Sequence, residues 1–354
     1  MHSHIKMYSR RRLLLATVGG VGYSCLNNVQ ADNQSRLDSS DLRPAQPLSV
    51  RLTDLKRDAA QQNRLRSLVV MHQGQVVLAE AFSGPSVETA VNVKSVSKSI
   101  LAALVGCALE RDVISDISVT LGDSIPELLP AKADPRVASL TLEHLLTMQA
   151  GLQRTSGPYY GQWVASNDWV NYVLSRPFIA EPGGRMLYST GDWHVLGAVL
   201  AKLSGADLLE LSREWLGKPL DIEFAPWTRD PQGRYMGGNE MSLSPLHMAR
   251  VGELYRQSGL WKQVRVLDRR WVTESFTPRT RSPYSGDDYG YGWFIRETER
   301  SGFAYARGYG GQFIHVLPAE GIVVAMTSDW TRSARGGVYT EQLHDLVTRH
   351  LLLG

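Results

Sequence analysis

Residues 93–101 read Val93-Lys94-Ser95-Val96-Ser97-Lys98-Ser99-Ile100-Leu101, and the apolar pattern continues through Leu109. The pattern predicts a helix that Ser95 and Lys98 open. Residues three apart share a helix face, so the Lys98 ammonium can reach the Ser95 hydroxyl. A serine is a weak nucleophile without a neighbouring base, and a half-buried lysine with a lowered pKa can supply one. The first helical turn adds unpaired N–H groups that favour developing negative charge.

The Ser-x-x-Lys spacing alone is weak evidence, because a chain this rich in serine contains about one such match by chance. Ser3-His4-Ile5-Lys6 is another match. The alternative interpretation of Ser95 is an N-terminal helix residue with a solvated lysine one turn later. The order of the segments further along the chain distinguishes the two interpretations.

Three such segments follow. Residues 139–152 predict a short amphipathic helix that ends at a glycine. Residues 182–192 lead into a helix from His194 to Leu203, and they read Pro182-Gly183-Gly184-Arg185-Met186-Leu187-Tyr188-Ser189-Thr190-Gly191-Asp192. A glycine-rich turn then runs into a strand and reads Arg307-Gly308-Tyr309-Gly310-Gly311-Gln312-Phe313-Ile314.

Taken together, these segments resemble the serine β-lactamase and penicillin-binding-protein superfamily. The resemblance is to its class C-like side, which includes carboxylesterases and the 6-aminohexanoate-dimer hydrolases. It covers residues 65–352. Three shorter segments look most like the dimer-hydrolase branch, namely residues 227–233, 248–254 and 267–272.

Strand patterns lie at both ends of the chain and helical patterns lie between them. Residues 65–82 alternate around Gln73-Gly74 and predict a β-hairpin. Helical patterning dominates residues 95–275, and short strands then return at 291–295, 304–306, 313–317 and 322–328 before a helix at 339–353. The predicted fold is α/β: an antiparallel sheet flanked by helices, formed from both termini, with an inserted all-α lobe. The resemblance implies the same β-lactamase/transpeptidase-like fold, with the active site between lobe and sheet.

The resemblance assigns roles to individual residues. Ser95 falls on the nucleophile, Lys98 on the lysine of the first motif, and Tyr188 on the tyrosine that transfers a proton between serine and leaving group. A phenol has an unperturbed pKa of about 10, so this role needs a nearby cation, and Lys98 is the obvious candidate. Backbone N–H groups of Ser95 and Tyr309 would form the oxyanion hole, because Tyr309 follows the third-motif glycine, Gly308.

Two departures from the β-lactamase motifs bear on substrate. Thr190 stands where Asn is usual, and Ala306-Arg307-Gly308 replaces Lys or His, then Thr or Ser, then Gly. The amide and the cation that hold a β-lactam are thus displaced or missing. Arg307 either supplies a substitute charge or is a strand-end arginine in solvent. The candidate substrate-binding residues are Tyr159, Tyr160, Trp163, Arg307, Gly308 and Gly310.

The predicted function is an exported serine hydrolase that cleaves a small-molecule ester or linear amide through an acyl-enzyme on Ser95. The alternatives are a β-lactamase or DD-peptidase, and a penicillin-binding-like module without turnover.

Gly122-Asp123-Ser124 is similar to a lipase motif but reads as a helix-capping loop. The histidines lack metal-ligand spacing, and we expect neither a metal site nor a cofactor.

The first residues read as an export signal. Arg10-Arg11 precedes an apolar run, and Val29-Gln30-Ala31 offers small residues for cleavage. This pattern favours twin-arginine export to the periplasm or medium, with an ordinary secretion signal as the alternative. The apolar run is too short for a retained membrane span. Cys25 as a lipid-attachment site is a further alternative, in a poor local context.

The predicted domain limits are residues 1–31 for the signal, 32–64 for a linker or N-terminal extension, and 65–354 for the hydrolase domain. The chain holds 38 Lys and Arg against 35 Asp and Glu, and four of the basic residues lie in the signal. The remaining chain is close to neutral, so nothing suggests a nucleic-acid partner or a basic membrane-binding face. Cys107 would be the one cysteine left, and no intrachain disulfide is expected.

Overall fold

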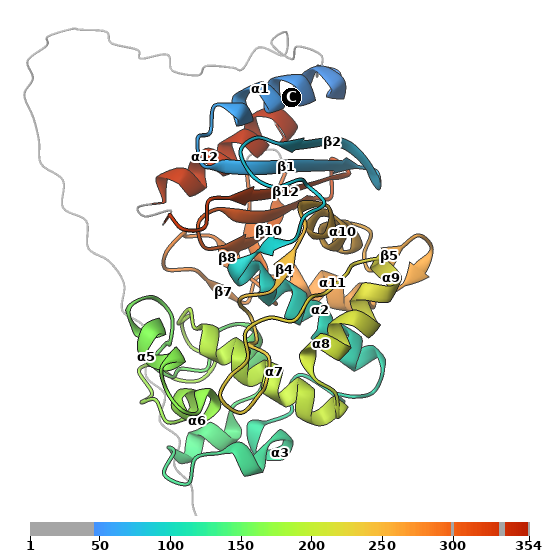
Figure 1. Cartoon of the computed structure of the whole chain (residues 1–354). Helices are drawn as coiled ribbons and strands as arrows, with labels where there is room; N and C mark the ends of the chain where they lie inside the picture. The colour runs from blue at the N-terminus through green and yellow to red at the C-terminus, as the bar shows by residue number, and fades with distance from the viewer. Residues whose placement is uncertain (1–45, 299–300, 333–336, 353–354) are drawn as a thin grey trace, which may run out of the picture. The chain divides into compact units, whose positions relative to one another are not determined.

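The computed structural model describes residues 46–298, 301–332 and 337–352. An eight-stranded antiparallel sheet forms one layer (Figure 1), in the order β2-β1-β12-β11-β10-β9-β8-β7. Its strands are β1 (Leu65–His72), β2 (Gln75–Ala81), β7 (Thr280–Arg281), β8 (Asp288–Tyr289), β9 (Phe294–Arg296), β10 (Phe303–Gly308), β11 (Gln312–Leu317) and β12 (Ile322–Ser328). Because β1 pairs with β12, the first and last parts of the domain lie side by side in one sheet, next to its β2 edge.

The predicted hairpin is confirmed. Gln73 and Gly74 join β1 to β2 with φ values of 51° and 82°. Two positive φ values in a two-residue turn match the right-handed twist of antiparallel strands, and glycine accepts such a φ without strain.

Helices cover both faces of the sheet, which explains why β11 and β12 are buried along their whole length. Phe313 on β11 packs against His344 of α12 (Val338–Val347). The next residue, Ile314, faces Gly252 of α10 (Pro245–Arg256) on the opposite side. Alternate side chains of one strand therefore enter two separate apolar layers.

The nucleophile helix of the sequence analysis is α2 (Ser97–Glu110), which is buried on nearly all sides. A helix that is apolar all round belongs in a protein interior. It packs against α7 (Thr190–Ser204), and α7 also contacts α3, α4, α6 and α8. The helical lobe comprises α3 (Leu121–Ser124), α4 (Leu142–Leu146), α5 (Tyr160–Val164), α6 (Trp169–Leu174), α8 (Leu208–Leu211) and α9 (Lys218–Leu220). The predicted fold class is thus confirmed.

The range 32–64, predicted as a linker or N-terminal extension, contains a packed helix. Helix α1 (Leu48–Ala60) lies within that range, and its Leu55 and Ala59 are fully buried. Arg51 donates hydrogen bonds to the carbonyls of His350 and Leu351. Leu48, Leu52, Leu55 and Ala59 recur at helical spacing, and this apolar stripe packs against the core of the domain while the rest of the helix surface is polar.

The other elements complete this framework. Helix α11 (Arg269–Ser275) places Trp271 against Gly106 of α2, and β5 (Leu260–Trp261) pairs with β6 (Val264–Arg265). Cys107 is a free, buried thiol, and burial raises its pKa to about 12. Across the described ranges, none of the helices has both the length and the apolar character of a membrane span. The predicted export signal, with Arg10-Arg11 and Cys25, lies outside the described residues.

A buried histidine pair between β11 and α12 should make the fold acid-sensitive. His315 and His344 lie 3.0 Å apart between ring nitrogens and are at most 1% exposed. Burial, with Arg296 nearby, lowers the pKa of His315 to about 3, and burial also lowers the pKa of His344. In the unfolded chain both would titrate near pH 6.5. The stability from the neutral pair is therefore present above that pH and declines as pH falls below it.

We expect urea denaturation to give a free energy of unfolding about 2 kcal/mol or more lower at pH 5 than at pH 7, since the unfolded chain binds the extra protons. The double variant His315→Leu/His344→Leu should flatten this dependence. An equally steep dependence in the double variant would show that other groups cause it.

Candidate active site

Ser95 lies in a 3-10 turn, Lys94–Val96, that runs directly into α2. The chain reaches this turn from β3 (Val91–Asn92), which pairs with β4 (Ser242–Leu243). Lys94 has a left-handed φ of 51°, which is unfavourable outside glycine and persists where neighbours hold it. Asn92 Oδ1 accepts a hydrogen bond from the backbone N–H of Lys94 at 2.9 Å, and Glu240 forms an ion pair with the Lys94 ammonium at 3.0 Å. These contacts fix the sharp turn from which Ser95 faces the cavity.

The side chain of Lys98 is buried beside Ser95. Its residue is 2% exposed, and Nζ lies 3.0 Å from Ser95 Oγ. Nζ also contacts Thr190 Oγ1 at 3.2 Å and the Gly238 carbonyl oxygen at 2.7 Å. Three acceptors match the three N–H donors of an ammonium. Burial lowers the pKa of Lys98 to about 7, while the Asp192 carboxylate opposes this shift, so a neutral amine is accessible at neutral pH.

Asp192 is a second buried ionisable group, and it was not among the residues predicted for the site. It lies in the first turn of α7 and is 2% exposed. Burial raises the pKa of its carboxyl to about 7, against the opposing effects of Ser189 and Lys98. The titrations of Lys98 and Asp192 are therefore coupled, because the charge on each group favours the charged form of the other. The only sequence signal was an acid shortly after Tyr188 at a helix start.

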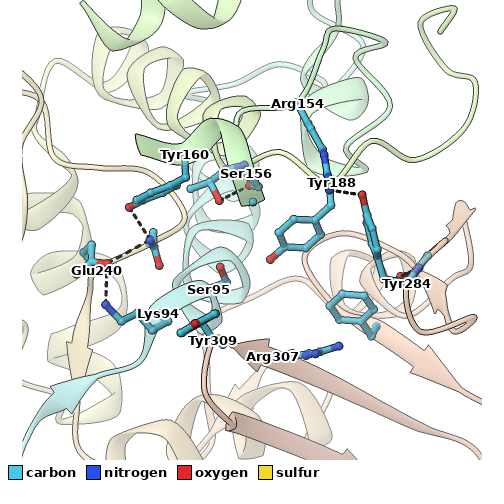
Figure 2. A pocket seen from close by; sticks show the side chains of 16 residues that line it. Lys94, Ser95, Arg154, Ser156, Tyr160, Tyr188, Glu240, Tyr284, Arg307 and Tyr309 are labelled. Carbon is cyan, nitrogen blue, oxygen red and sulfur yellow. Dashed lines mark hydrogen bonds and ion pairs between the residues drawn. The ribbon is translucent and has the colours of Figure 1, made fainter. Parts of the chain in front are cut away.

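Tyr188 lies over the same serine and lysine. Lys98 Nζ is 5.2 Å from the centroid of the Tyr188 ring. Burial raises the pKa of the Tyr188 phenol, and the Ser95 hydroxyl and the charge of Arg307 act in the opposite direction. Ser95, Lys98 and Tyr188, the three residues predicted to share proton transfer, are thus brought together, and Ser95 and Tyr188 face the cavity (Figure 2).

These groups open into a cavity of about 510 Å³ between the helical lobe and the sheet. Arg154, Ser156 and Tyr160 line it from the lobe. Tyr284 and Arg307 line it from the sheet side, and Arg154 donates a hydrogen bond to the Tyr284 hydroxyl across it (Figure 2). The complete lining is Lys94, Ser95, Arg154, Ser156, Gly157, Tyr160, Tyr188, Thr190, Asn239, Glu240, Ser282, Tyr284, Phe294, Arg307, Gly308 and Tyr309.

Strand β10 approaches the nucleophile closely because it ends in glycine. A Cβ on Gly308 would lie 2.3 Å from the Val93 carbonyl oxygen, a contact that real side chains do not make. The absence of a side chain lets the end of β10 lie against the turn that carries Ser95. Tyr309, the next residue, lines the cavity together with Ser95. This juxtaposition is the one that the predicted oxyanion hole requires.

The structure separates the six candidate substrate-binding residues into two groups. Tyr160, Arg307 and Gly308 line the cavity, and Arg307 is only partly buried there, near the end of β10. Tyr159 and Gly310 are not part of the lining. Trp163 is wrong as a substrate contact because it is fully buried, where it donates to the Trp169 carbonyl and packs beside His194.

Potential metal ligands do not gather in the described part of the chain: no group of three or more His, Cys, Asp or Glu side chains has the proximity to hold an ion there. The cavity itself is lined by hydroxyl, amine, guanidinium, amide and carboxylate groups. Such a set suits nucleophilic attack and proton transfer.

Comparison with known proteins places the chain in a family. The Beta-lactamase family model matches residues 56–349, and the chain belongs to this family. Its fold is that of the serine β-lactamase and penicillin-binding-protein superfamily. A Bacillus anthracis protein assigned as a 6-aminohexanoate-dimer hydrolase is similar, with a TM-score of 0.69, 20% identity, and coverage of 84% of this chain and 81% of that one.

Two further solved structures have the same fold. EstCE1, described as a hydrolase with promiscuous acyltransferase activity, has a TM-score of 0.69 at 20% identity, covering 85% of this chain and 98% of its own. A family VIII carboxylesterase has a TM-score of 0.67 at 16% identity, with the same two coverages of 85% and 98%.

We expect a fluorophosphonate to label Ser95, because Lys98 lies within hydrogen-bond distance and can accept the proton. The rate should rise with pH through about 7 as Lys98 loses its proton. Asp192→Asn removes the charge that raises the pKa of Lys98, so the midpoint should move to lower pH. Peptide mapping identifies the labelled serine, and intact-mass measurement over a pH series gives the labelling rate and its midpoint. Labelling of Ser124, which donates to the Thr120 carbonyl instead, would contradict the assignment.

Proposed function

We propose that this protein is an exported serine hydrolase that cleaves an ester or a linear amide through an acyl-enzyme on Ser95. The observation that carries the proposal is the 3.0 Å contact between Ser95 Oγ and the buried Lys98 Nζ, beside Tyr188 and open to a cavity. A binding module needs no deprotonating group aimed at an exposed hydroxyl. The arrangement is the one that activates a serine.

The proposed reaction has two steps. Ser95 Oγ attacks the carbonyl carbon while its proton passes to Lys98 or Tyr188, and the oxyanion lies near the N–H groups of Ser95 and Tyr309. The bond to the leaving alcohol or amine then breaks, and the leaving group receives that proton through Tyr188. Water attacks the acyl ester, releases the carboxylic acid and restores the serine hydroxyl.

The residues around the cavity favour ester or linear amide substrates over β-lactams. The Thr190 hydroxyl already contacts Lys98 and lies 3.0 Å from Ser156 Oγ, so it is engaged within the protein. Ala306 is fully buried and presents no cation. The fold similarity to EstCE1 and to a carboxylesterase adds support, since those proteins are described as a hydrolase and an esterase.

We expect p-nitrophenyl acetate or butyrate, and linear aminohexanoyl amides, to be hydrolysed with a kcat/KM well above that for a chromogenic cephalosporin. Each missing oriented contact to a β-lactam costs about 1–3 kcal/mol, a factor of roughly 10 to 100. Simple acyl esters do not use those contacts. Steady-state kinetics on the three substrate classes measures the difference.

Ser95→Ala is the control for that panel and should abolish turnover, while Lys98→Ala and Tyr188→Phe should each lower the rate about 10²-fold or more. If kcat/KM for the cephalosporin exceeded that for the esters and amides by about tenfold, the protein would be a β-lactamase and this proposal would be wrong. Binding of substrates without turnover in the unmodified chain would favour the non-catalytic alternative.

The export part of the proposal rests on Arg10-Arg11 before a modest apolar run. We expect Arg10→Lys/Arg11→Lys to leave precursor in the cytoplasm, because the twin-arginine route requires the pair and a general secretion signal tolerates lysine. Cell fractionation with antibody detection measures the outcome. Unchanged export of the double variant would indicate the ordinary secretion route.

A further inference from the structure

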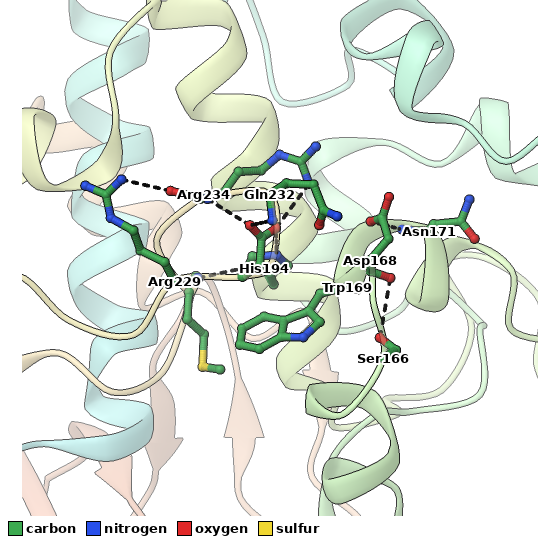
Figure 3. A network of polar contacts seen from close by, with 12 residues as sticks. Ser166, Asp168, Trp169, Asn171, His194, Arg229, Gln232 and Arg234 are labelled. Atoms are coloured by element: carbon green, nitrogen blue, oxygen red, sulfur yellow. Dashed lines mark hydrogen bonds and ion pairs between the residues drawn. The ribbon is translucent and has the colours of Figure 1, made fainter.

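A buried histidine lies behind the cavity, on α7. His194 is fully buried, and its Nε2 lies 3.1 Å from Asp230 Oδ2 (Figure 3). On the other side of the ring, Nδ1 accepts a hydrogen bond from the Gly237 N–H at 3.3 Å. A backbone N–H can only donate, so Nδ1 is unprotonated and Nε2–H donates to the carboxylate. Both partners therefore fix a single neutral tautomer.

The carboxylate of Asp230 is itself held in place. It accepts from the backbone N–H of Gln232 at 3.0 Å and of Arg234 at 2.8 Å, and from the Arg234 guanidinium at 3.1 Å. Trp163 and Trp169 pack against the His194 ring at centroid distances of 5.8 and 5.4 Å. The imidazole thus has almost no freedom to rotate.

Gly237 connects this histidine to the candidate catalytic base. The next residue, Gly238, provides the carbonyl that accepts from Lys98 Nζ at 2.7 Å. A Cβ on Gly237 would lie 2.2 Å from the Trp193 carbonyl oxygen, so the backbone lies directly against α7 here. The same segment continues into Asn239 and Glu240, which line the cavity. Any displacement of residues 237–238 would move an acceptor of Lys98.

We propose that His194 is a positioning residue that holds the Gly237–Gly238 backbone and thereby keeps the Gly238 carbonyl against Lys98. The inference rests on the proposed function, because it assigns Lys98 the role of base. The carbonyl both orients the amine and favours its charged form. The charged or titratable groups that face Lys98 are Asp192 and Tyr188, and those that face His194 are Asp230, Arg234 and Asp168.

Two substitutions separate the contacts of His194. His194→Asn places an amide oxygen near the position of Nδ1, so it can accept from Gly237 but does not reach Asp230. His194→Gln reaches Asp230 but leaves the Gly237 N–H without its acceptor. His344→Gln is the matched control, because His344 is another buried histidine, whose partner is His315 between α12 and the sheet.

The measurements are the rate and pH profile of fluorophosphonate labelling, kcat and KM for a p-nitrophenyl ester, and Tm for the full chain. We expect His194→Gln to lower kcat and labelling about tenfold, with KM changed less than about twofold. Its pH midpoint should move to lower pH, because Lys98 loses an acceptor. His194→Asn should stay closer to the unmodified chain, and His344→Gln should lower Tm with the pH midpoint unchanged.

The inference is overturned if His194→Gln keeps the unmodified pH midpoint and rate. It is also overturned if the rate losses of both His194 variants simply follow their losses of Tm, since that is the behaviour of a purely structural residue. Failure of the unmodified chain to label at Ser95 would instead overturn the proposed function, and this inference with it.

Discussion

The burial of one ammonium group constrains the arrangement of the whole site. An unpaired charge in a protein interior costs several kcal/mol, so Lys98 needs its acceptors in place. Those acceptors come from three separate segments: Ser95 before α2, Thr190 at the start of α7, and Gly238 in the loop before β4. The packing of α2 on α7 and the path of the loop are therefore tied to a single side chain.

Two lysines four residues apart show how environment alone divides their roles. Lys94 forms an ion pair with Glu240 at the cavity edge and holds the turn that carries Ser95. Lys98 contacts two neutral hydroxyls and a carbonyl instead of a directly bonded carboxylate, and burial lowers its pKa to about 7. The first lysine is a structural cation and the second is suited to exchange a proton. Only Lys98 lies one helical turn from Ser95, on the same face of the helix.

Local chemistry explains which features the sequence predicted. The Gln73-Gly74 turn and the Ser95–Lys98 spacing depend on residues at most three apart, and both are as expected. Gly238 contacts Lys98 across 140 residues, and Gly237 contacts His194 across 43, so no local pattern reveals them. Trp163 shows a different limit, because an aromatic residue in a loop-like segment suits a pocket and a core equally well.

The position of Arg307 addresses a difficulty in the proton transfer. Tyr188 needs a neighbouring cation to act as phenolate, yet burial raises its pKa. Lys98 cannot be both that fixed cation and a neutral base, because with a pKa of about 7 it loses its charge when it becomes able to accept a proton. An arginine stays charged throughout, and the charge of Arg307, on the sheet side of the cavity, opposes the rise in the pKa of Tyr188 that burial causes. In the proposed reaction, this permanent charge on β10 would favour the phenolate while Lys98 remains free to titrate.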